Sequence, residues 1–435
     1  MRFSIWTSGC QMNRADSDRL AAALQLAGHE PAPPEEADLI ILNGCVVRES
    51  AERRALARLR ALAGLKRRRP EMRIALMGCL VGTQPSDDLA RRFPMVDAFF
   101  PPSALEEVLV AFPGPRPVDA SCVPHLASGQ RPVTAFLPVI YGCDSHCTYC
   151  IVPLRRGRER SRPVEEILTE AHCMVAQGVR EITLLGQNVD AYGHDLPERP
   201  TLADLLRLLH EIEGLWRIRF LTSHPKDMSE ELIQTVAQLP KVCPEISLPA
   251  QAGHDRLLRR MGRPYTVEAY RRLVDRIRAI IPEVALSTDV IVGFPGETEE
   301  EYQGTRRLLE EIRFDVVHVA IYSPRPGTAA ARLPDDVPAE VKERRRQELE
   351  QLQETIAAQI NARYLGKVLP VLVEDLHRAK WRGRTPQGKW CFFVDPMPRR
   401  GEMVQVHVTQ TGPWSLQGER FEEPTFQRKD EPFTR

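Results

Sequence analysis

The stretch Gly142-Cys143-Asp144-Ser145-His146-Cys147-Thr148-Tyr149-Cys150 carries three cysteines with the spacing Cys-x3-Cys-x2-Cys. Three thiolates this close together can bind three irons of a 4Fe-4S cluster. No fourth cysteine follows as in the bacterial ferredoxin run, so one iron lacks a protein ligand. An open position on a metal is where a substrate or cofactor binds. Zinc would need a fourth Cys or His, and His146 would be a cramped ligand, so a cluster fits better than a zinc knuckle or a disulfide.

The sequence around these cysteines alternates between strand-like and helical patterns, which is typical of an α/β fold with parallel strands. Six βα units predict a partial (β/α)6 barrel, and the cysteines follow its first strand. The chemistry of such a barrel sits at the carboxyl ends of its strands. The expected strands are Leu137–Ile140, Ile182–Leu185, Ile218–Leu221, Glu245–Leu248, Leu286–Ile291 and Val316–Ile321.

The first third of the chain repeats the alternation, with strands expected at 3–6, 39–42 and 74–77. A cysteine follows each strand, namely Cys10, Cys45 and Cys79, at spacings of 35 and 34 residues. Because ligands bind outside the carboxyl ends of parallel strands, the three thiols are expected to converge on one spot. Any one of them alone would be interpreted as a small buried residue. Three in register predict a second metal site with three cysteine ligands.

Proline-rich breaks divide the chain into three expected domains, at residues 1–115, 129–360 and 362–424. The first break runs from Pro113 to Pro132, and the second begins at Pro324 and precedes a charged helix over about 339–364. After Gly366 short β-rich runs predict a small β-barrel, an architecture common in nucleic-acid-binding proteins.

The last domain interleaves cations with aromatic residues, an arrangement that suits stacking on unpaired bases and contact with phosphates. A solvated charged face on an ordinary barrel is the alternative, and these residues alone do not decide between the two. The residues are Arg378, Lys380, Arg382, Arg384 and Lys389, with Trp381 and Trp390.

The composition favours a chain that stays in the cytoplasm and away from membranes. The start, Met1 to Trp6, lacks the apolar region of a signal peptide, and no apolar run approaches a transmembrane length. Ten cysteines without secretory features fit a reducing compartment. Lys+Arg and Asp+Glu are equal at 59 each, so any polyanion would have to be bound by local patches.

The cysteine loop, including Tyr149 before the last cysteine, resembles the signature of the radical S-adenosylmethionine (SAM) superfamily. Cysteine triads in two domains resemble the methylthiotransferases of that superfamily, and Thr7-Ser8-Gly9-Cys10-Gln11-Met12-Asn13 resembles the MiaB subfamily. Small departures occur at Gly44, where Thr is common, and at Ala250 and Ala252. Other matching stretches are Arg48-Glu49, Leu185-Gly186-Gln187-Asn188, Thr222-Ser223-His224-Pro225 and Val292-Gly293-Phe294-Pro295-Gly296-Glu297-Thr298.

This resemblance implies a Rossmann- or flavodoxin-like N-terminal sheet, a radical SAM barrel and a C-terminal TRAM domain. It implies two 4Fe-4S clusters, held by Cys10, Cys45 and Cys79 and by Cys143, Cys147 and Cys150. The implied substrate is tRNA, in which C2 of N6-isopentenyladenosine at position 37 receives a methylthio group. One SAM would methylate a sulfur on the first cluster, and a second would yield the radical at the catalytic triad Cys143, Cys147 and Cys150. An electron donor such as flavodoxin or ferredoxin and a monomeric chain are also expected.

Contacts to SAM are expected from polar residues at or just after barrel strands, namely Gln187, Ser223, Gln251 and Asp289. Ordinary loop capping is the alternative for each. Arg156, in the arginine run that follows the cluster loop, is a further candidate for the SAM carboxylate or a tRNA phosphate. A solvated face is the alternative for that run.

Two other functions stay open at this point. The same chemistry could act on another modified adenosine or on ribosomal protein S12, although Gln11-Met12-Asn13 speaks against both substrates. From a different class, the chain could be a non-catalytic iron–sulfur protein with an RNA-binding tail, although an electron carrier gains nothing from an open iron.

Overall fold

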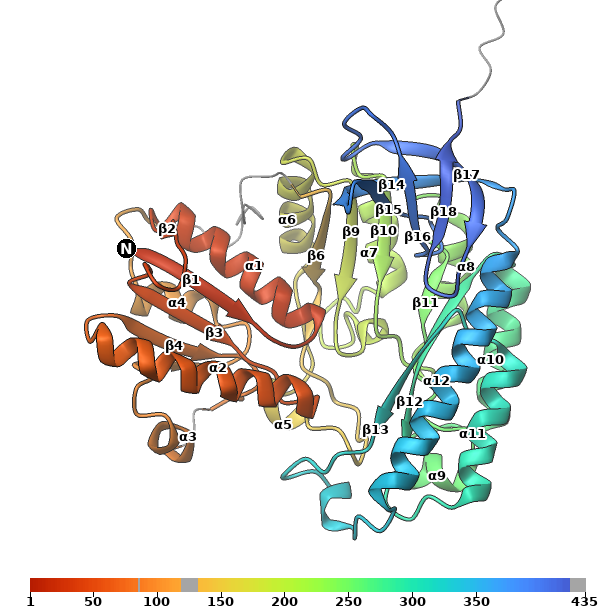
Figure 1. The fold of residues 1–435 in the computed structure, drawn as a ribbon, viewed down its shortest axis with the longest axis horizontal. Helices are drawn as coiled ribbons and strands as arrows, with labels where there is room; N and C mark the ends of the chain where they lie inside the picture. Colours follow the sequence, from red (N-terminus) through yellow and green to blue (C-terminus); the bar gives the residue numbers. More distant parts are fainter. Residues whose placement is uncertain (85–86, 119–131, 423–435) are drawn as a thin grey trace, which may run out of the picture. The chain divides into compact units, whose positions relative to one another are not determined.

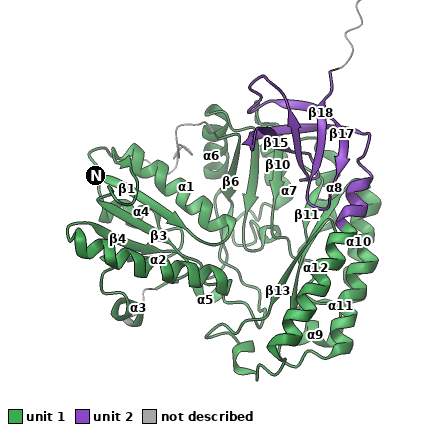
Figure 2. Cartoon of the chain, in the orientation of Figure 1, with its two compact units in different colours: residues 1–356 green, residues 357–435 purple. Residues whose placement is uncertain are grey.

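A computed structural model describes residues 1–84, 87–118 and 132–422 of the chain (Figure 1). The chain divides into two compact units, residues 1–356 and 357–435 (Figure 2). The first unit contains both the N-terminal sheet and the six central strands. Most of the segment between these two parts, residues 119–131, lies outside the described residues, so a domain boundary there stays a prediction.

The N-terminal part is an α/β layer around a five-stranded parallel sheet in the order β2-β1-β3-β4-β5 (Figure 1). Every residue of β3 is buried, because helices cover both faces of the sheet and its centre must be apolar. The strands are β1 (Arg2–Thr7), β2 (Glu30–Pro31), β3 (Leu39–Asn43), β4 (Arg73–Met77) and β5 (Ala98–Phe100). The helices are α1 (Gln11–Leu26), α2 (Glu49–Arg68), α3 (Asp87–Arg92) and α4 (Leu105–Ala111).

The apolar pattern of the sequence predicts a helix from Asp16 to Leu26, but helix α1 begins five residues earlier, directly after Cys10. Its first turns bury polar side chains, those of Asn13, Asp16 and Ser17. A buried polar face interrupts the apolar periodicity on which a sequence-based helix start depends. Cys10 is therefore the N-cap residue of α1 rather than part of a loop before it.

The central part contains the six expected parallel strands as two three-stranded sheets, β10-β9-β6 and β11-β12-β13. This arrangement confirms the predicted partial barrel. The strands are β6 (Thr134–Pro138), β9 (Glu181–Leu185), β10 (Arg217–Phe220), β11 (Glu245–Ser247), β12 (Ala285–Val292) and β13 (Val316–Ile321). The main helices are α5 (Val152–Arg156), α6 (Val164–Ala176), α7 (Leu202–His210), α8 (Glu230–Gln238), α9 (Asp255–Arg260), α10 (Val267–Ile280), α11 (Glu299–Ile312) and α12 (Ala339–Ala362).

The strand expected at 137–140 is divided in two. Strand β6 ends at Pro138, and the N–H of Val139 makes a last bond to the carbonyl oxygen of Leu185 in β9 at 2.9 Å. A short strand β7 (Ile140–Tyr141) follows and pairs with β8 (Arg160–Ser161) instead of the barrel. The cysteine loop 143–150 is thus held between the two strands of a small hairpin.

The second unit is a closed five-stranded barrel in the order β14-β15-β16-β18-β17, as the sequence predicts. Its core is made of valines with Phe393, Cys391 and Leu416. The strands are β14 (Val368–His377), β15 (Lys380–Arg384), β16 (Trp390–Val394), β17 (Met403–Thr411) and β18 (Leu416–Arg420).

Within the described residues, no helix combines the length and the apolar character that crossing a bilayer requires.

Gly142 tests how tightly the cysteine loop is built. A Cβ at this position would lie 1.9 Å from the carbonyl oxygen of Arg158, and its φ is +69°. Gly142→Ala should lower the free energy of unfolding by about 2–4 kcal/mol. Gly64→Ala, in the interior of α2 with its nearest neighbour 3.9 Å away, should raise it by about 0.5–1 kcal/mol. Equal melting temperatures for the two variants would contradict this account of the loop.

Candidate functional site

The three N-terminal cysteines lie together at the carboxyl edge of the first sheet. Cys10 follows β1, Cys45 follows β3 and Cys79 follows β4. The thiols of Cys10 and Cys79 lie 3.8 and 4.0 Å from Oδ1 of Asn13. A hydrogen bond between Cys45 and Cys79 lowers the pKa of Cys45 and raises that of Cys79. The structure therefore brings together the three thiols that the strand spacing predicts.

Gly9 makes this convergence possible. A Cβ at Gly9 would lie 2.4 Å from Cβ of Cys45, and the residue has a φ of +133°. A side chain at this position would push Cys45 away from the other two cysteines.

The second triad occupies the loop between β7 and α5. Cys143 is buried, and Cys147 and Cys150 are half-buried. Burial raises the pKa of the Cys143 thiol, and it raises that of Cys150 to about 12. Thiols in such surroundings ionise when a positive charge, such as the iron of a cluster, is bound beside them.

The two triads have the same pattern of hydrogen-bond donors on sulfur. In each, a backbone N–H bonds the cysteine two residues before it at 3.4 Å, from Val47 to Cys45 and from Ser145 to Cys143. In each, a buried guanidinium also bonds a second cysteine. These bonds run from Nε of Arg156 to Cys79 at 3.2 Å and from Nη1 of Arg263 to Cys147 at 3.4 Å.

These surroundings fit iron–sulfur clusters. N–H donors to sulfur are among the features by which proteins tune such clusters. Among the described residues, no three His, Cys, Asp or Glu side chains converge tightly enough for one metal ion. A cluster binds each cysteine to a different iron, so its ligands lie farther apart than those of a single ion.

A cavity of about 190 Å³ joins the N-terminal triad to the barrel. Cys10 and Cys45 line it from one side, and Gln187 and Thr222 line it from the ends of β9 and β10. Arg48 and Arg54, at the start of α2, complete its polar lining together with Gln11 and Ser50. Of the four residues expected to contact SAM, Gln187 reaches this cavity.

Backbone strain marks two loops at the barrel strand ends. Thr222 and Gln251 both have a φ of +69°, which is unfavourable for residues with side chains. Gln251 donates its N–H to the carbonyl oxygen of Asp289 at 2.8 Å, so these two expected SAM contacts are neighbours. Burial raises the pKa of the Asp289 carboxyl, and His318, Arg48 and Arg263 act in the opposite direction. Strain of this kind concentrates at functional sites.

Ser223 already has a partner. Its hydroxyl donates to the Asp190 carboxylate at 2.9 Å, and the N–H of His224 donates to the same group at 3.1 Å. Burial raises the pKa of Asp190 to about 7 despite these two donors. Ser223 thus holds a buried carboxyl, and its expected contact with SAM stays a prediction.

Arg156 contacts the N-terminal triad. Its side chain is 2% exposed and bonds Asn13 at 2.7 Å and Asp16 at 3.3 Å in addition to Cys79. Both Nε and Nη2 are therefore engaged by the first sheet and α1. This is a contact between the two parts of the unit, and the expected contact of Arg156 with a SAM carboxylate or a tRNA phosphate stays a prediction.

Arg263 is the functional candidate that sequence reasoning missed. It lies between α9 and α10, outside every recognisable motif, and is 6% exposed. Besides Cys147 it bonds the carbonyl of Pro249 and the hydroxyl of Tyr265, both at 2.8 Å. Its position 116 residues beyond Cys147 left no local signal.

In the second unit, the cations on the barrel are partly compensated. Arg382 and Arg384 lie over the ring of Trp390, at 4.6 and 5.3 Å from its centroid. Arg382 is also paired with Asp375 and Arg384 with Glu374. Trp381 packs against the barrel core, so Trp390 is the better candidate for base stacking.

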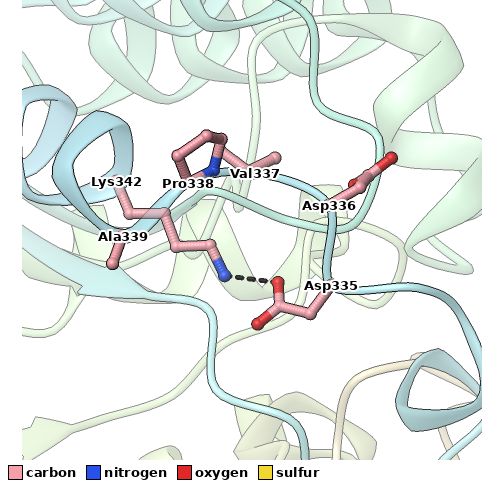
Figure 3. A pocket seen from close by; sticks show the side chains of 6 residues that line it. All are labelled: Asp335, Asp336, Val337, Pro338, Ala339 and Lys342. Atoms are coloured by element: carbon pink, nitrogen blue, oxygen red, sulfur yellow. Dashed lines mark hydrogen bonds and ion pairs between the residues drawn. The ribbon is translucent and has the colours of Figure 1, made fainter.

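A second pocket, of about 320 Å³, lies at the start of α12 (Figure 3). Its polar side chains are already engaged, because Lys342 pairs with Asp335 and Asp336 accepts from the N–H of Gly296 at 2.5 Å. None of its lining residues is one that the sequence singles out.

Three known families match successive parts of the chain. The Radical SAM superfamily matches residues 137–309, the uncharacterized protein family UPF0004 matches residues 2–101, and the TRAM domain matches residues 362–421. The first two matches each contain one cysteine triad, and the third covers the closed barrel.

Curated relatives match along the whole length of the chain. The tRNA-2-methylthio-N(6)-dimethylallyladenosine synthase of Roseiflexus sp. (strain RS-1) is 52% identical over 100% of this chain and 91% of the relative. The protein of the same name from Dictyoglomus thermophilum is 46% identical over 96% of this chain and 98% of the relative. The chain belongs to the tRNA-2-methylthio-N(6)-dimethylallyladenosine synthase family.

Solved structures support the fold of this family member. The radical SAM methyltransferase TsrM from Kitasatospora setae superposes with a TM-score of 0.57 over 85% of this chain and 78% of that chain. The sequences are 15% identical, so the likeness concerns the fold alone.

Asp190 predicts a pH dependence of stability. Its folded-state pKa of about 7 lies above the ordinary value, so the folded chain binds more protons than the unfolded chain between the two values. Stability from this group is full at low pH and is lost as the pH rises toward 7. Between about pH 5 and pH 8 the wild type should lose about 2 kcal/mol relative to Asp190→Asn. Thermal unfolding at both pH values measures the difference, and parallel changes in the two proteins would refute the assignment.

Proposed function

We propose that the chain is a tRNA methylthiotransferase that converts N6-isopentenyladenosine at tRNA position 37 to its 2-methylthio derivative. It uses SAM and two 4Fe-4S clusters. The observation that carries the proposal is the pair of cysteine triads with matching sulfur donors, in a chain 52% identical to a relative with this activity in its name. The relatives favour tRNA over ribosomal protein S12 as the substrate. They also favour an enzyme over a non-catalytic iron–sulfur protein.

In this proposal Cys143, Cys147 and Cys150 hold the cluster at which SAM is cleaved, and Cys10, Cys45 and Cys79 hold the N-terminal cluster. When bound, these groups supply the radical chemistry and the sulfur that an unactivated aromatic C–H bond requires. The protein supplies position and shielding. The cavity lined by Cys10, Cys45 and Gln187 would receive the base next to the N-terminal cluster. A base at this depth must leave the stack of its loop, as in other base-modifying enzymes.

Gln187, Gln251 and Asp289, at the ends of barrel strands, are the proposed polar contacts of SAM. The C-terminal barrel is the proposed holder of tRNA, with Trp390 as a stacking platform. Since Asp375 and Glu374 compensate two of its arginines, stacking should contribute more to binding there than net charge. In this proposal an electron carrier such as flavodoxin or ferredoxin reduces the cluster at which SAM is cleaved. The enzyme acts as a monomer in the cytoplasm.

The two triads should be separable by role. With Cys143, Cys147 and Cys150 replaced by Ala, anaerobic incubation with SAM and dithionite should release no 5′-deoxyadenosine. With Cys10, Cys45 and Cys79 replaced by Ala, 5′-deoxyadenosine should still form, while methylthiolated tRNA should be absent. Chromatography of the small molecules and mass spectrometry of digested tRNA measure the two products.

Cys243→Ala is a matched control, because this buried cysteine lies outside both triads. It should retain both products. Methylthiolated tRNA at the normal rate from the N-terminal triple variant would show that those cysteines are merely packed residues.

A further inference from the structure

Two arginine side chains at the cavity beside the N-terminal triad have no hydrogen-bond or ion-pair partner among the described residues. Arg48 and Arg54 line the same cavity as Cys10 and Cys45, and both are exposed. Within the described part of the chain, neither side chain makes a hydrogen bond or an ion pair. Arg48 also lies close enough to Asp289 to lower the pKa of that carboxyl, which places its charge at the mouth of the barrel.

The two carboxylates in the first turn of α2 do not compensate these charges, because both already have other partners. Glu52 is paired with Arg325 at 2.7 Å. Glu49 is paired with Arg53 at 3.4 Å and accepts from the hydroxyl of Ser323 at 3.2 Å. The rim of the cavity therefore keeps a local positive charge although the net charge of the chain is zero.

We propose that Arg48 and Arg54 bind the phosphates on either side of the nucleotide whose base enters the cavity. This inference rests on the proposed function. A base that reaches Cys10 and Cys45 leaves its charged backbone at the rim, where water is accessible and the two guanidinium groups lie. Arginine binds phosphate through paired N–H donors, and such contacts position the nucleic acid without reading its sequence.

The test is equilibrium binding of an anticodon stem-loop RNA to the full chain at several salt concentrations. Arg48→Gln with Arg54→Gln should weaken binding at least about tenfold, since each lost bond involves a charged group. The slope of log K against log salt should fall by about one unit for each arginine. The control, Arg271→Gln with Arg276→Gln, removes arginines paired with Glu311 and Glu230 and should leave the slope unchanged.

A modified RNA identifies the contact. Neutral methylphosphonate linkages flanking nucleotide 37 should weaken binding to the wild type but cause no further loss in the double variant. An unaltered salt slope in the double variant, or an equal loss with the modified RNA in both proteins, would overturn the inference alone. If the wild type does not bind the stem-loop at all, both this inference and the proposed function fail.

A different observation carries a second inference, which concerns Arg156 and Arg263. Each is buried, and each donates to the sulfur of one cysteine in one triad. Fixed acceptors hold each guanidinium in place, Asn13 and Asp16 for Arg156, and Pro249 and Tyr265 for Arg263. Neither group can turn away from its sulfur without leaving a buried charge unpaired, which is costly.

We infer that Arg156 and Arg263 are positioning residues, and that each sets the reduction potential of the cluster its triad would hold. This inference also rests on the proposed function. Reduction adds negative charge to a cluster, and an N–H donor or a cation at its sulfur stabilises the reduced form. Burial strengthens the effect because the surrounding dielectric constant is low. Loss of either guanidinium should therefore make its own cluster harder to reduce.

The experiment is a redox titration followed by electron paramagnetic resonance, with reconstituted protein in which the other triad has been replaced by Ala. Arg156→Gln should lower the midpoint potential of the cluster at Cys10, Cys45 and Cys79. Arg263→Gln should lower that of the cluster at Cys143, Cys147 and Cys150. Each substitution is the control for the other, since neither should move the potential of the distant cluster.

Lysine variants keep the test decisive if a Gln variant holds no cluster. Lysine retains the charge but cannot bond several fixed acceptors in one plane, so the potential should shift in the same direction by less. Unchanged potentials in all variants, or equal shifts in both clusters, would overturn the inference. Clusters absent even from the wild type would overturn the proposed function as well.

Discussion

A guanidinium group that is almost fully buried must have fixed acceptors, and Arg156 finds all of its known acceptors in another part of the chain. It extends from the helix that directly follows the cysteine loop 143–150. It bonds Asn13 and Asp16 of α1 and the sulfur of Cys79. Removing either side of this contact would leave an unpaired charge inside the protein, typically at a cost of about 3–5 kcal/mol. The N-terminal sheet and the cysteine loop are consequently fixed to each other, and residues 1–356 behave as one compact unit.

The two triads solve the same physical problem in different surroundings. Several thiolates close together repel one another, and burial makes each of them harder to ionise. In both triads a backbone N–H donates to one sulfur and a buried guanidinium donates to another. The N-terminal triad comes from three strand ends that are far apart in sequence, whereas Cys143, Cys147 and Cys150 come from the loop of one short hairpin. Their likeness therefore arises from the chemistry of the bound group and not from local sequence.

The sequence predicted the parts of the site that depend on spacing along the chain. Cys143, Cys147 and Cys150 lie within eight residues of sequence, and Cys10, Cys45 and Cys79 follow strands whose order in a parallel sheet is constrained by topology. The contacts of Arg156 with the N-terminal part, and of Arg263 with Cys147, were not predictable, because each joins residues 77 to 143 positions apart and no periodicity records such a pair. The start of α1 was missed for a related reason, since Asn13 and Asp16 are buried for their polar contacts and not for apolar packing. Ser223 lies at the expected strand end, but only the fold shows that its hydroxyl donates a hydrogen bond to Asp190.

The central claim is that this chain holds two 4Fe-4S clusters, one in each triad, and iron content tests it most directly. Anaerobically reconstituted wild-type protein should contain about eight irons per chain, and each triple cysteine variant should contain about four. A wild-type chain with about four irons, or full iron retention after Cys143, Cys147 and Cys150 are replaced by Ala, would contradict the account.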